Sequence, residues 1–347
     1  MGLQIGEIVP RKEISLDELK GKVIAVDAFN ALYQFLANIR QLDGSPLTDN
    51  QGRITSHLSG LFYRTTNLMA KGLKLVYVFD GISPELKGKT KELREGRKED
   101  AEIKYEHAKA FGTADEMLKY AKQTIRLNDG MIKESKELLD ALGLPVIQAP
   151  SEGESQCAFI VRQNDAFAVA SQDYDSLLFG ATRVIQNLTL SRKRKTFRGF
   201  IPVMPEMIEL ENVFNSLQLN IEQLICLGIL VGTDFNVGGV KSIGPKRAIQ
   251  LVKMYKQPAL IFDAVSRMAK DGKIPEPEFD WKDIFEIFRK PDVTKEYEIK
   301  FRDIDTKKVK ELLCKEHDFS EERVDNAVER ITKQKTSASQ KDLKKWF

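Results

Sequence analysis

The fold is decided by a short apolar run that ends in an acid, Lys22-Val23-Ile24-Ala25-Val26-Asp27. The same pattern returns in Leu75-Val76-Tyr77-Val78-Phe79-Asp80. A third run, Ala166-Phe167-Ala168-Val169-Ala170, is followed by Ser171-Gln172-Asp173-Tyr174-Asp175. Helical stretches separate these β-branched runs, and such alternation is typical of parallel sheets. The sequence therefore predicts an α/β fold with a central, mostly parallel sheet flanked by helices.

Acidic residues follow each predicted strand at the point where the strand ends. A fourth run, Leu144-Pro145-Val146-Ile147, leads to two glutamates, so that the strand ends carry six acids: Asp27, Asp80, Glu152, Glu154, Asp173 and Asp175. One aspartate after a strand is commonly a turn residue or a helix cap. The carboxyl ends of neighbouring parallel strands, however, meet at one crevice, where six like charges are unfavourable unless cations neutralise them. All-oxygen ligands select hard cations, so the pattern predicts Mg²⁺ or Mn²⁺ and not zinc.

Composition sets the broad class of the protein. The chain has 347 residues, 42% hydrophobic and 30% charged, enough to bury the core of one large domain or two. Lys plus Arg number 54 and Asp plus Glu 51, so net charge alone favours no partner. The three cysteines lie far apart, which excludes a thiolate zinc site and predicts a reducing compartment, and the three histidines are too scattered to predict a histidine-rich metal site. Without a membrane-length apolar run or the layout of a signal peptide, the sequence predicts a soluble intracellular protein.

A seventh acid follows a second kind of element. Ile221–Val231 is predicted as an apolar helix, and Gly232-Thr233-Asp234 comes directly after it. The next segment, residues 238–248, resembles a helix–hairpin–helix element, whose Gly-containing turn points backbone N–H groups at a DNA phosphate. Lys246 and Arg247 stand where they would add cationic contacts. A plain turn between two helices is the alternative interpretation.

Five linked motifs resemble those of the flap endonuclease family, the structure-specific 5′ nucleases of the XPG type. In the family's order and spacing, the motifs are residues 26–28, 77–81, 149–154, 171–175 and 232–234. The resemblance covers nearly the whole chain, which ends at an aromatic pair and looks like the archaeal branch. Gly153 and Ser155 stand where alanine is frequent, and Ser242 where the hairpin often has glycine. None of these departures removes a carboxylate, but serine does not readily adopt positive φ, so the geometry of the hairpin stays open.

The resemblance implies two divalent ions in one active site, Mg²⁺ with Mn²⁺ able to substitute. It divides the carboxylates into four for one ion and three for the other, some acting through water: Asp27, Asp80, Glu152 and Glu154, then Asp173, Asp175 and Asp234. Two ions about 4 Å apart bind the scissile phosphate, lower the pKa of the attacking water and stabilise the leaving oxygen. The resemblance also implies a potassium ion, K⁺, at the helix–hairpin–helix.

Residues 84–135 are dominated by alternating basic and acidic side chains. On composition alone, this segment reads equally well as a solvent-exposed helix with i,i+4 ion pairs. The resemblance implies an arch over the active site, through which the 5′ single strand passes. It also implies that Lys87 and Arg94 are catalytic cations that stabilise charge on the scissile phosphate, and a separation of seven residues places both on one helix face. With little apolar surface to bury, the segment is expected to be mobile without DNA.

Further residues match family positions that contact DNA. Tyr33 stands where the family stacks a base near the cleavage point, whereas Phe29, Leu32 and Phe35 are predicted to pack in the core. Thr55 falls where the family forms a pocket for a one-nucleotide 3′ flap. The other matching positions are Arg40, Arg64, Gly232, Ser242, Gly244, Lys246 and Arg247.

A strongly basic run, Arg192-Lys193-Arg194-Lys195, has no acid nearby. It predicts a basic β-hairpin that lies near duplex backbone. A nuclear localisation signal and a merely solvated hairpin are the alternatives.

The last residues form a separate unit of the sequence. After Thr332 the composition changes to Lys, Gln, Ser and Thr, which predicts a flexible linker. The linker ends in a segment that resembles the sliding-clamp (PCNA) binding box, with Gln340 as its polar anchor and an apolar plug of Leu343, Trp346 and Phe347. A separation of three places Leu343 and Trp346 on the same side of one 3₁₀ turn. Docking of the plug onto the chain's own body is the alternative.

Together these features predict a metal-dependent 5′ flap endonuclease and 5′–3′ exonuclease that cuts branched DNA in Okazaki fragment maturation and long-patch base excision repair. A PIN-like ribonuclease and a clamp-tethered junction-binding adaptor without turnover are the alternatives. The protein is expected to be a monomer, cytoplasmic or nucleoid-associated in an archaeon and nuclear in a eukaryote. The predicted regions are an N-terminal nuclease region, the remainder of the arch, an internal nuclease region with the hairpin, a helical C-terminal part and the tail, at residues 1–100, 101–135, 136–255, 256–331 and 332–347. The helical C-terminal part is expected to close the fold beside the hairpin.

Overall fold

The computed structural model describes residues 3–41, 43–189, 193–196 and 199–343, with 85, 89, 114, 193–196, 199–202 and 335–343 described as backbone only. Its centre is a seven-stranded sheet in the order β1-β9-β6-β5-β2-β3-β4. The strands are β1 (Lys12–Glu13), β2 (Val23–Asp27), β3 (Lys74–Phe79), β4 (Val146–Gln148), β5 (Ala168–Ala170), β6 (Arg183–Gln186) and β9 (Glu206–Glu209). Strands β2 to β6 pair in parallel, and β9 runs antiparallel to both β6 and β1. The predicted mostly parallel α/β sheet is confirmed.

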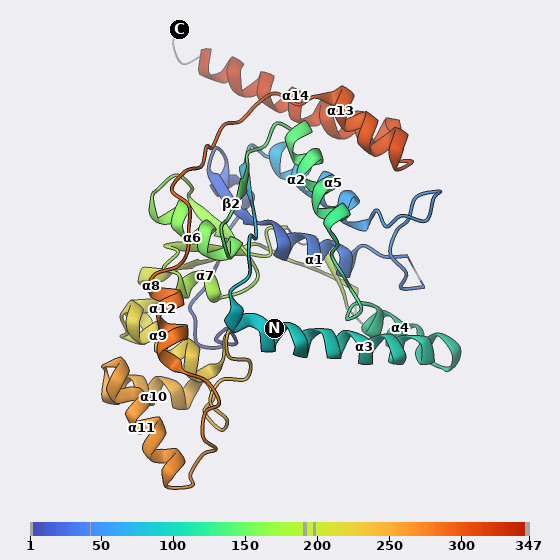
Figure 1. Ribbon diagram of the computed structural model, residues 1–347. Coiled ribbons are helices and arrows are strands. Elements are labelled where there is room, and N and C mark those ends of the chain that lie inside the picture. Colours follow the sequence, from blue (N-terminus) through green and yellow to red (C-terminus); the bar gives the residue numbers. More distant parts are fainter. Residues whose placement is uncertain (1–2, 42, 190–192, 197–198, 344–347) are drawn as a thin grey trace.

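The central strands are buried on both faces because apolar residues occupy both phases of their alternation. In β2, Ile24 and Val26 belong to one hydrophobic core and Ala25 to the other. One face is covered by α1 (Ala28–Asn38), α2 (Ser56–Met69), α5 (Asp129–Ala141), α13 (Thr306–Lys310) and α14 (Glu321–Leu343). The other is covered by α6 (Gly153–Arg162), α7 (Asp175–Leu178), α8 (Leu210–Leu217) and α9 (Ile221–Val231). Helices α10 (Pro245–Tyr255), α11 (Pro258–Lys270) and α12 (Trp281–Arg289) pack against α9, and α10 and α11 extend away from the sheet (Figure 1).

The C-terminal part divides between the two faces. Helices α11 and α12 pack beside α9, as predicted, but residues 291–305 then cross to the opposite face (Figure 1). Along this path the Gln156 amide donates to the Thr294 carbonyl at 3.0 Å, and Asp305 N–H donates to the Ala141 carbonyl at 2.8 Å. Helix α13, the π-helix η3 (Glu311–Glu316) and α14 therefore pack against α2 and α5 instead of beside the hairpin.

Helix α14 continues to Leu343, so the backbone is helical where the sequence predicted a flexible linker from residue 332. The first turns of α14 pack Val324 and Val328 into the core, and helix propagation from such an anchored segment needs no further apolar residue. The division of the chain into regions stays a prediction.

A helical hairpin projects from the body below α1 (Figure 1). It comprises the 3₁₀ turn η2 (Glu85–Lys87), α3 (Gly88–Phe111) and α4 (Ala114–Ala121), the segment predicted to form an arch. A second, two-stranded sheet pairs β7 (Lys193–Thr196) with β8 (Gly199–Pro202), which confirms the predicted hairpin at the basic run. Arg192, the first residue of the basic run, lies outside the described residues.

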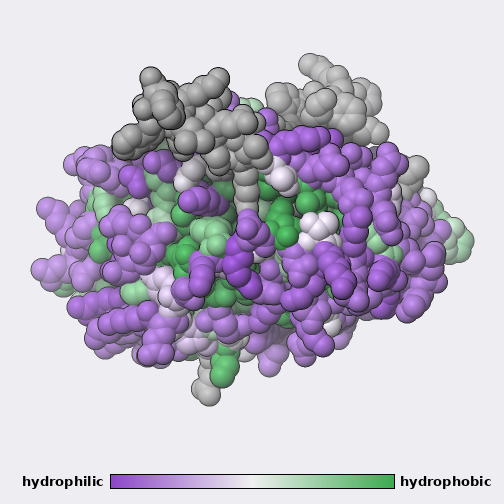
Figure 2. Space-filling view, turned by 90° about the horizontal axis from the view of Figure 1, so that it is seen from above, coloured by the Kyte–Doolittle hydropathy of each residue, from purple (hydrophilic) through white to green (hydrophobic). Residues whose placement is uncertain are grey.

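The face of the molecule seen in Figure 2 is mostly hydrophilic. Figure 2 shows hydrophilic residues over most of one face, with hydrophobic ones gathered near its middle. In the described part of the chain, no single helix is long and apolar enough to cross a membrane. Only α8 and α9, bent by 81° at their junction, reach that length and composition when taken together.

Candidate active site

Each of the six strand-end acids lies at the carboxyl edge of the sheet. Asp27 ends β2 and caps α1, where Asn30 N–H donates to its Oδ1 at 3.0 Å. Asp80 directly follows β3, and Glu152 caps α6 after β4. The chain places β3 and β4 on one side of β2 and β5 and β6 on the other, so the acids surround the point where strand order reverses. Open α/β sheets bind ligands at that point.

A glycine lets two of these strand ends approach each other. Gly153 N–H donates to Asp80 Oδ1 at 2.7 Å. A Cβ atom at residue 153 would lie 2.6 Å from the same oxygen, so a larger residue requires the Asp80 carboxylate to shift. Glycine at this position therefore keeps the Asp80 carboxylate tied to the start of α6.

Asp173, after β5, and Glu154, in α6, are oriented by neutral side chains. The Asn30 amide donates to Asp173 Oδ2 at 2.9 Å, and the Ser171 hydroxyl donates to Glu154 Oε1 at 2.7 Å. Neither Asn30 nor Ser171 was assigned a role from the sequence, although Ser171 lies inside a motif and Asn30 lies two residues beyond one. Their contacts cross 143 and 17 residues, so spacing along the chain gave no signal for the first of them.

The electrostatics show that the carboxylates share one crevice. Burial raises the pKa of Asp27 well above its ordinary value, and the charges of Asp80, Asp173 and Glu152 raise it further. Burial likewise raises the pKa of Asp80 to about 6, with Glu152 adding to the effect. Like charges in a poorly solvated crevice oppose joint ionisation, so the site favours the entry of cations.

The deeper acids show the same effect more strongly. Burial, followed by repulsion from Asp173, raises the pKa of Glu154 well above its ordinary value. Burial and repulsion from Asp234 do the same for Asp175, whose pKa is also raised well above the ordinary value. Asp234, at the end of α9, thereby joins the six strand-end acids at one site.

Two cations of the arch segment enter this crevice. The Lys87 ammonium donates to Glu152 Oε2 and lies 3.6 Å from Asp234 Oδ2. The Arg94 guanidinium nitrogen Nη2 lies 2.7 Å from both oxygens of Asp234. Burial alone would raise the pKa of Asp234, but Lys87 and Arg94 outweigh it and the pKa is lowered. The structure thus brings Lys87 and Arg94 together at the acids, as the sequence predicted.

The carboxylate oxygens of the site are suitable ligands for hard cations, although the described acids do not enclose an ion-sized position in this structure. Asp175 Oδ1 is buried without a hydrogen-bond partner, an arrangement that costs free energy unless a cation or a proton satisfies the oxygen. Carboxylate oxygens are the ligands that Mg²⁺ and Mn²⁺ prefer. Among the described residues, no three Asp, Glu, His or Cys side chains are arranged to hold a metal ion. In this arrangement Lys87 and Arg94 supply the nearest positive charge to Glu152 and Asp234.

Tyr33 lies on the rim of the crevice, and its ring side chain is partly exposed, at 39%. Burial raises the pKa of its hydroxyl, which is close enough to Arg94 and Asp80 to be affected by both charges. Leu32 and Phe35, in contrast, are buried in the core, as predicted. Phe29 is partly buried and packs edge-on against Phe79, at 6.2 Å between ring centroids.

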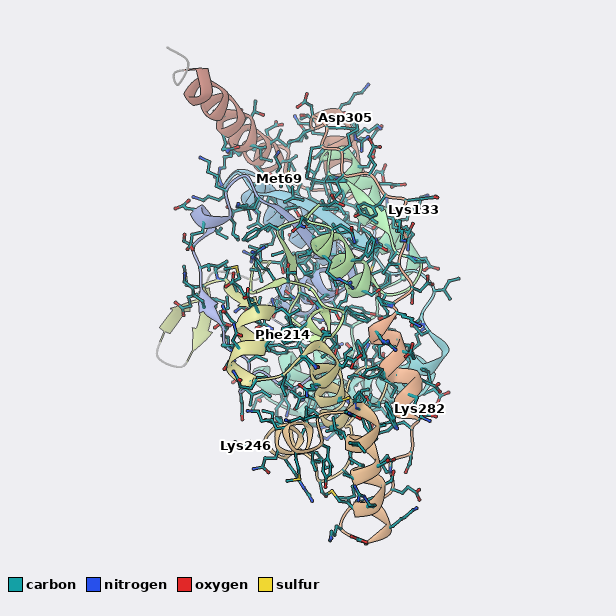
Figure 3. The ribbon with its side chains drawn as sticks, turned by 90° about the vertical axis from the view of Figure 1, so that its left-hand side faces the viewer. Met69, Lys133, Phe214, Lys246, Lys282 and Asp305 are labelled. Carbon is teal, nitrogen blue, oxygen red and sulfur yellow. The ribbon has the colours of Figure 1, made fainter. Side chains whose placement is uncertain are left out.

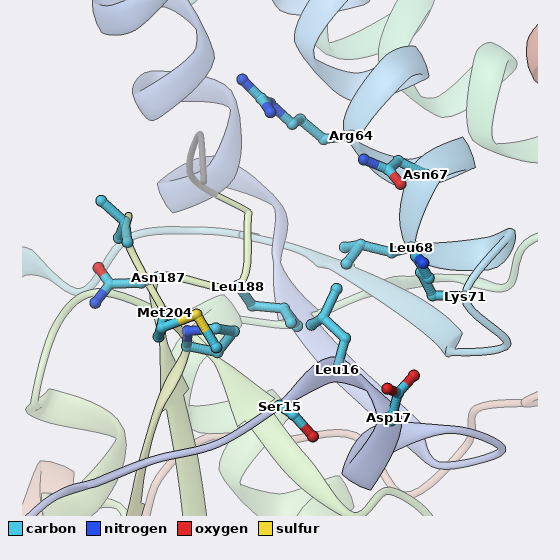
Figure 4. A pocket seen from close by; sticks show the side chains of 12 residues that line it. Ser15, Leu16, Asp17, Arg64, Asn67, Leu68, Lys71, Asn187, Leu188 and Met204 are labelled. Atoms are coloured by element: carbon cyan, nitrogen blue, oxygen red, sulfur yellow. The ribbon is translucent and has the colours of Figure 1, made fainter. Parts of the chain in front are cut away.

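Three other predicted DNA contacts lie away from the acids. Arg40 donates to the Leu36 and Gly44 carbonyls at 3.0 and 2.7 Å, so its guanidinium holds the loop after α1. Thr55 is buried at the start of α2. Arg64 lines a cavity of about 230 Å³ between the 3₁₀ turn η1 (Leu16–Leu19), α2 and the connection from β6 to β9 (Figure 4). Their roles in DNA binding stay predictions.

The predicted helix–hairpin–helix is formed by α9 and α10. Gly232 ends α9 with φ of 111°, and a Cβ atom there would lie 2.5 Å from the Gly239 nitrogen. This glycine is therefore required by the backbone itself. Ser242 has a φ of 69°, the left-handed conformation that glycine adopts more easily than serine. Its main-chain carbonyl accepts a hydrogen bond from Arg247 Nη1 at 3.1 Å.

The N-terminus of α10 follows this turn. Gly244 caps the helix and Pro245 occupies its first turn, as helix starts favour. Lys246 comes next and lies at the outer surface of the molecule, as Figure 3 shows. The turn and the helix start therefore have the exposed position that phosphate binding requires.

Two of the three histidines, which lie far apart in the sequence, come together in the structure around one glutamate. His57 Nε2 lies 3.1 Å from Glu134 Oε2, and His317 Nε2 lies 3.5 Å from Glu134 Oε1. His317 Nδ1 lies 2.9 Å from Asp49 Oδ2. The packing of residues 316–319 against α2 brings these distant positions together. The cluster joins the loop after α1 to the C-terminal helices.

The predicted clamp-binding box is described in part. Gln340 and Leu343 lie in the backbone of α14. Trp346 and Phe347 lie outside the described residues, as does the predicted 3₁₀ turn beyond Leu343.

Comparisons with known proteins agree with this architecture. The XPG N-terminal domain matches residues 3–101, and the XPG I-region matches residues 143–234. Flap endonuclease 1 of Pyrococcus furiosus is 50% identical over 349 residues, which cover 100% of this chain and 99% of that protein. Flap endonuclease 1 of Thermococcus onnurineus is 49% identical over 349 residues, with the same coverage.

Solved structures show the same fold. Flap endonuclease-1 from Methanococcus jannaschii is 39% identical, with a TM-score of 0.75, and covers 97% of this chain and 100% of its own. The catalytic core of Rad2 in complex with a DNA substrate is 22% identical, with a TM-score of 0.71, over 95% of this chain and 100% of its own.

A parallel sheet with acids along its carboxyl edge, matched in both XPG regions, defines the class of XPG-type nucleases. Within that class, this chain belongs to the flap endonuclease family. The predicted family, its archaeal affinity and the reaction class, hydrolysis of phosphodiester bonds, are thereby confirmed.

Proposed function

We propose that this chain cuts branched DNA at the base of 5′ flaps, and removes nucleotides from 5′ ends, with two Mg²⁺ ions held by its seven carboxylates. One observation carries the proposal. Seven acids from five segments converge where strand order reverses, and among the described residues Lys87 and Arg94 are cationic side chains that pair with them there. Such a crevice needs further cations before it accepts the polyanionic backbone of DNA.

Each group of acids has a place in this proposal. Asp27, Asp80, Glu152 and Glu154 would hold one ion, and Asp173, Asp175 and Asp234 the other. When bound, the ions supply a nucleophilic water and stabilise the leaving oxygen. The chain's own residues keep the oxygens in place: Asn30 fixes Asp173, Ser171 fixes Glu154, and Gly153 N–H fixes Asp80.

Lys87 and Arg94 would orient the scissile phosphate. Both now contact carboxylates, Lys87 at Glu152 and Arg94 at Asp234. With Glu152 and Asp234 serving as ligands, Lys87 and Arg94 would be free to bind the phosphate oxygens by charge-assisted hydrogen bonds. Hydrolysis leaves a 5′-phosphate on the downstream duplex and a 3′-hydroxyl on the released strand.

Substrate recognition would combine stacking with backbone contacts. Tyr33, partly exposed beside Arg94, would stack on an unpaired base next to the cut. The exposed turn around Ser242 and Gly244, with Lys246 and Arg247, would hold duplex phosphates, with K⁺ bound at the turn. Arg40, Thr55, Arg64 and Gly232 would contribute further contacts, Thr55 to a one-nucleotide 3′ flap.

The biological setting follows from this chemistry. Flaps arise where a strand is displaced, so the enzyme would serve Okazaki fragment maturation and long-patch base excision repair. The segment from Gln340 to Phe347 would bind a sliding clamp, with the enzyme itself a monomer that acts at the nucleoid.

The test is cleavage of end-labelled double-flap DNA with and without Mg²⁺. We expect an Mg²⁺-dependent cut near the flap base that is lost in Asp173→Ala. Asp263→Ala, which removes an exposed carboxylate on α11, serves as the matched control and should cut normally. Tight binding without cutting would instead favour a junction-binding adaptor, and preferential cutting of RNA would favour a ribonuclease.

A further inference from the structure

The N-terminal end of α3, together with its N-cap residue, touches the wall of the active site at three places: Lys87, Thr90 and Arg94. Separations of three and four residues place them on one face of the helix. Thr90 has no role in the family resemblance or in the proposed chemistry. We propose that Thr90 is a positioning residue, which fixes the register of α3 so that Lys87 and Arg94 reach the scissile phosphate. This inference rests on the proposed function.

The contact made by Thr90 is short and buried. Its hydroxyl Oγ1 donates to the backbone carbonyl of Asp234 at 2.6 Å, and only 3% of the residue is exposed. A threonine within a helix commonly donates to the carbonyl four residues before it. Here the hydroxyl is directed out of the helix instead, toward the loop that carries an acid of the active site.

The loop that accepts this bond is rigid. Asn236 Oδ1 accepts from Thr233 N–H at 3.1 Å and from the Thr233 hydroxyl at 2.8 Å. Thr233 Oγ1 in turn accepts from Phe235 N–H at 3.1 Å, and the Asn236 amide donates to the Ile229 carbonyl in α9 at 2.7 Å. Asp234 therefore presents its carbonyl from a closed turn, and the bond transfers the fixed position of that turn to α3.

The Thr90 contact differs in kind from those of the two cations. Lys87 and Arg94 are paired with carboxylates, for which divalent ions compete, and they must leave those carboxylates to reach a phosphate. Thr90 binds the main-chain carbonyl of Asp234 and not its carboxylate. The bond therefore persists while the cations change partners, and it keeps the end of α3 in place during that exchange.

Little else holds this end of the helix. Beyond Arg94, Ile103 and Phe111 are 71% and 85% exposed. Arg126 pairs with Glu95 and Glu102, but all three side chains are largely exposed, and such pairs contribute little. The buried Ala101 and Ala108 continue the seven-residue spacing of Lys87 and Arg94, but they lie farther along α3, beyond the part that touches the acids. The buried Thr90 thus gives α3 a neutral hydrogen bond to the Asp234 loop, beside the ion pair of the half-exposed Arg94 with Asp234.

Two variants separate the hydroxyl from the shape of the side chain. Thr90→Val keeps the volume but removes the donor, and Thr90→Ser keeps the donor. We expect Thr90→Val to lower kcat on flap DNA by about five- to tenfold with KM unchanged, the range that loss of one neutral hydrogen bond allows. Thr90→Ser should retain kcat within about twofold.

The decisive comparison uses a second background. If Thr90 acts through the cations, Thr90→Val should lower kcat much less in Lys87→Ala/Arg94→Ala than in the wild type. An equal fall in both backgrounds, or wild-type kcat in Thr90→Val, would overturn the inference. Hydrogen exchange at residues 88–94 should become faster in Thr90→Val, while the unfolding midpoint of the whole chain stays within about 2 °C. A wild type that does not cut flaps would refute the proposed function before the variants are compared.

Discussion

Replacing Asn30 by alanine should slow the chemical step without unfolding the protein. The Asn30 amide donates to Asp173 Oδ2 at 2.9 Å, and its Oδ1 accepts from Gln34 Nε2 at 2.5 Å and from Gln172 N–H at 3.3 Å. One side chain therefore links α1 to the segment that carries Asp173. Alanine breaks all three bonds and leaves the carboxylate free to turn.

The magnitude follows from the charge of the acceptor. A hydrogen bond to a charged group contributes about 1.5–3 kcal/mol, and the loss of the bond to Asp173 is the largest of the three effects. If that bond orients Asp173 in the transition state, kcat falls by a factor of about 10 to 100. Because Asp173 is also a proposed ligand, the Mg²⁺ concentration that gives half the maximal rate should rise.

The assay is single-turnover cleavage of flap DNA over a range of Mg²⁺ concentrations. Asn38→Ala is the matched control, since Asn38 lies exposed at the end of the same helix and donates only to the Gln34 carbonyl, at 2.9 Å. That variant should cut at the wild-type rate. Wild-type kcat in Asn30→Ala, or an equal fall in both variants, would refute the reasoning.

Three further predictions concern stability. Gly232→Ala should lower the free energy of unfolding by at least about 2 kcal/mol, because φ is 111° and the new Cβ would lie 2.5 Å from the Gly239 nitrogen. Gly96→Ala should instead stabilise α3, because no atom lies near the new Cβ. Chemical denaturation that ranks the two variants the other way would contradict this. Without metal, stability should fall as pH rises from about 4 through the raised pKa of Asp80 at about 6, because an acid with a raised pKa favours the folded state when it is protonated. Mg²⁺ should therefore raise Tm more at about pH 7.5 than at about pH 4.5. Equal shifts of Tm at the two pH values would argue against ion binding by these acids. Burial opposes ionisation of Asp49, but hydrogen bonds from Arg53 and His317 outweigh it and lower the pKa of Asp49 to about 2. The Asp49 carboxylate therefore stabilises the fold above about pH 4, and this effect is lost toward pH 2. The difference in Tm between the wild type and Asp49→Asn should shrink as pH falls from about 4 to about 2.

Much of the fold was predictable from the sequence because its strands are short, apolar and closed by acids. β-branched residues in both phases identify strands buried on two faces, and their parallel arrangement then places Asp27, Asp80 and Asp173 at one edge. The path of residues 291–305 was not predictable, since it has no periodicity and is held by contacts such as that of Gln156 with Thr294. The helical backbone of α14 beyond residue 332 depends on packing of its first turns, which composition does not reveal.

The site was predictable in its charged residues and not in its neutral ones. Carboxylates and cations are recognisable by type and position, but Asn30 and Thr90 matter only through partners 143 and 144 residues away. The same holds for His57 and His317, which meet at Glu134 only after the two ends of the chain pack together. Ser242 shows a third limit, because its positive φ is set by the turn against the preference of its own side chain.

The central claim is that the seven carboxylates bind two divalent ions that the cutting of flap DNA requires. The most direct measurement counts Mn²⁺ bound per chain by electron paramagnetic resonance in the complex with flap DNA and records cleavage on the same samples. We expect two ions per wild-type chain with cutting, and fewer ions in Asp173→Ala with cleavage reduced by orders of magnitude. Full cleavage in Asp173→Ala, or cutting by a wild-type complex that binds no divalent ion, would contradict it.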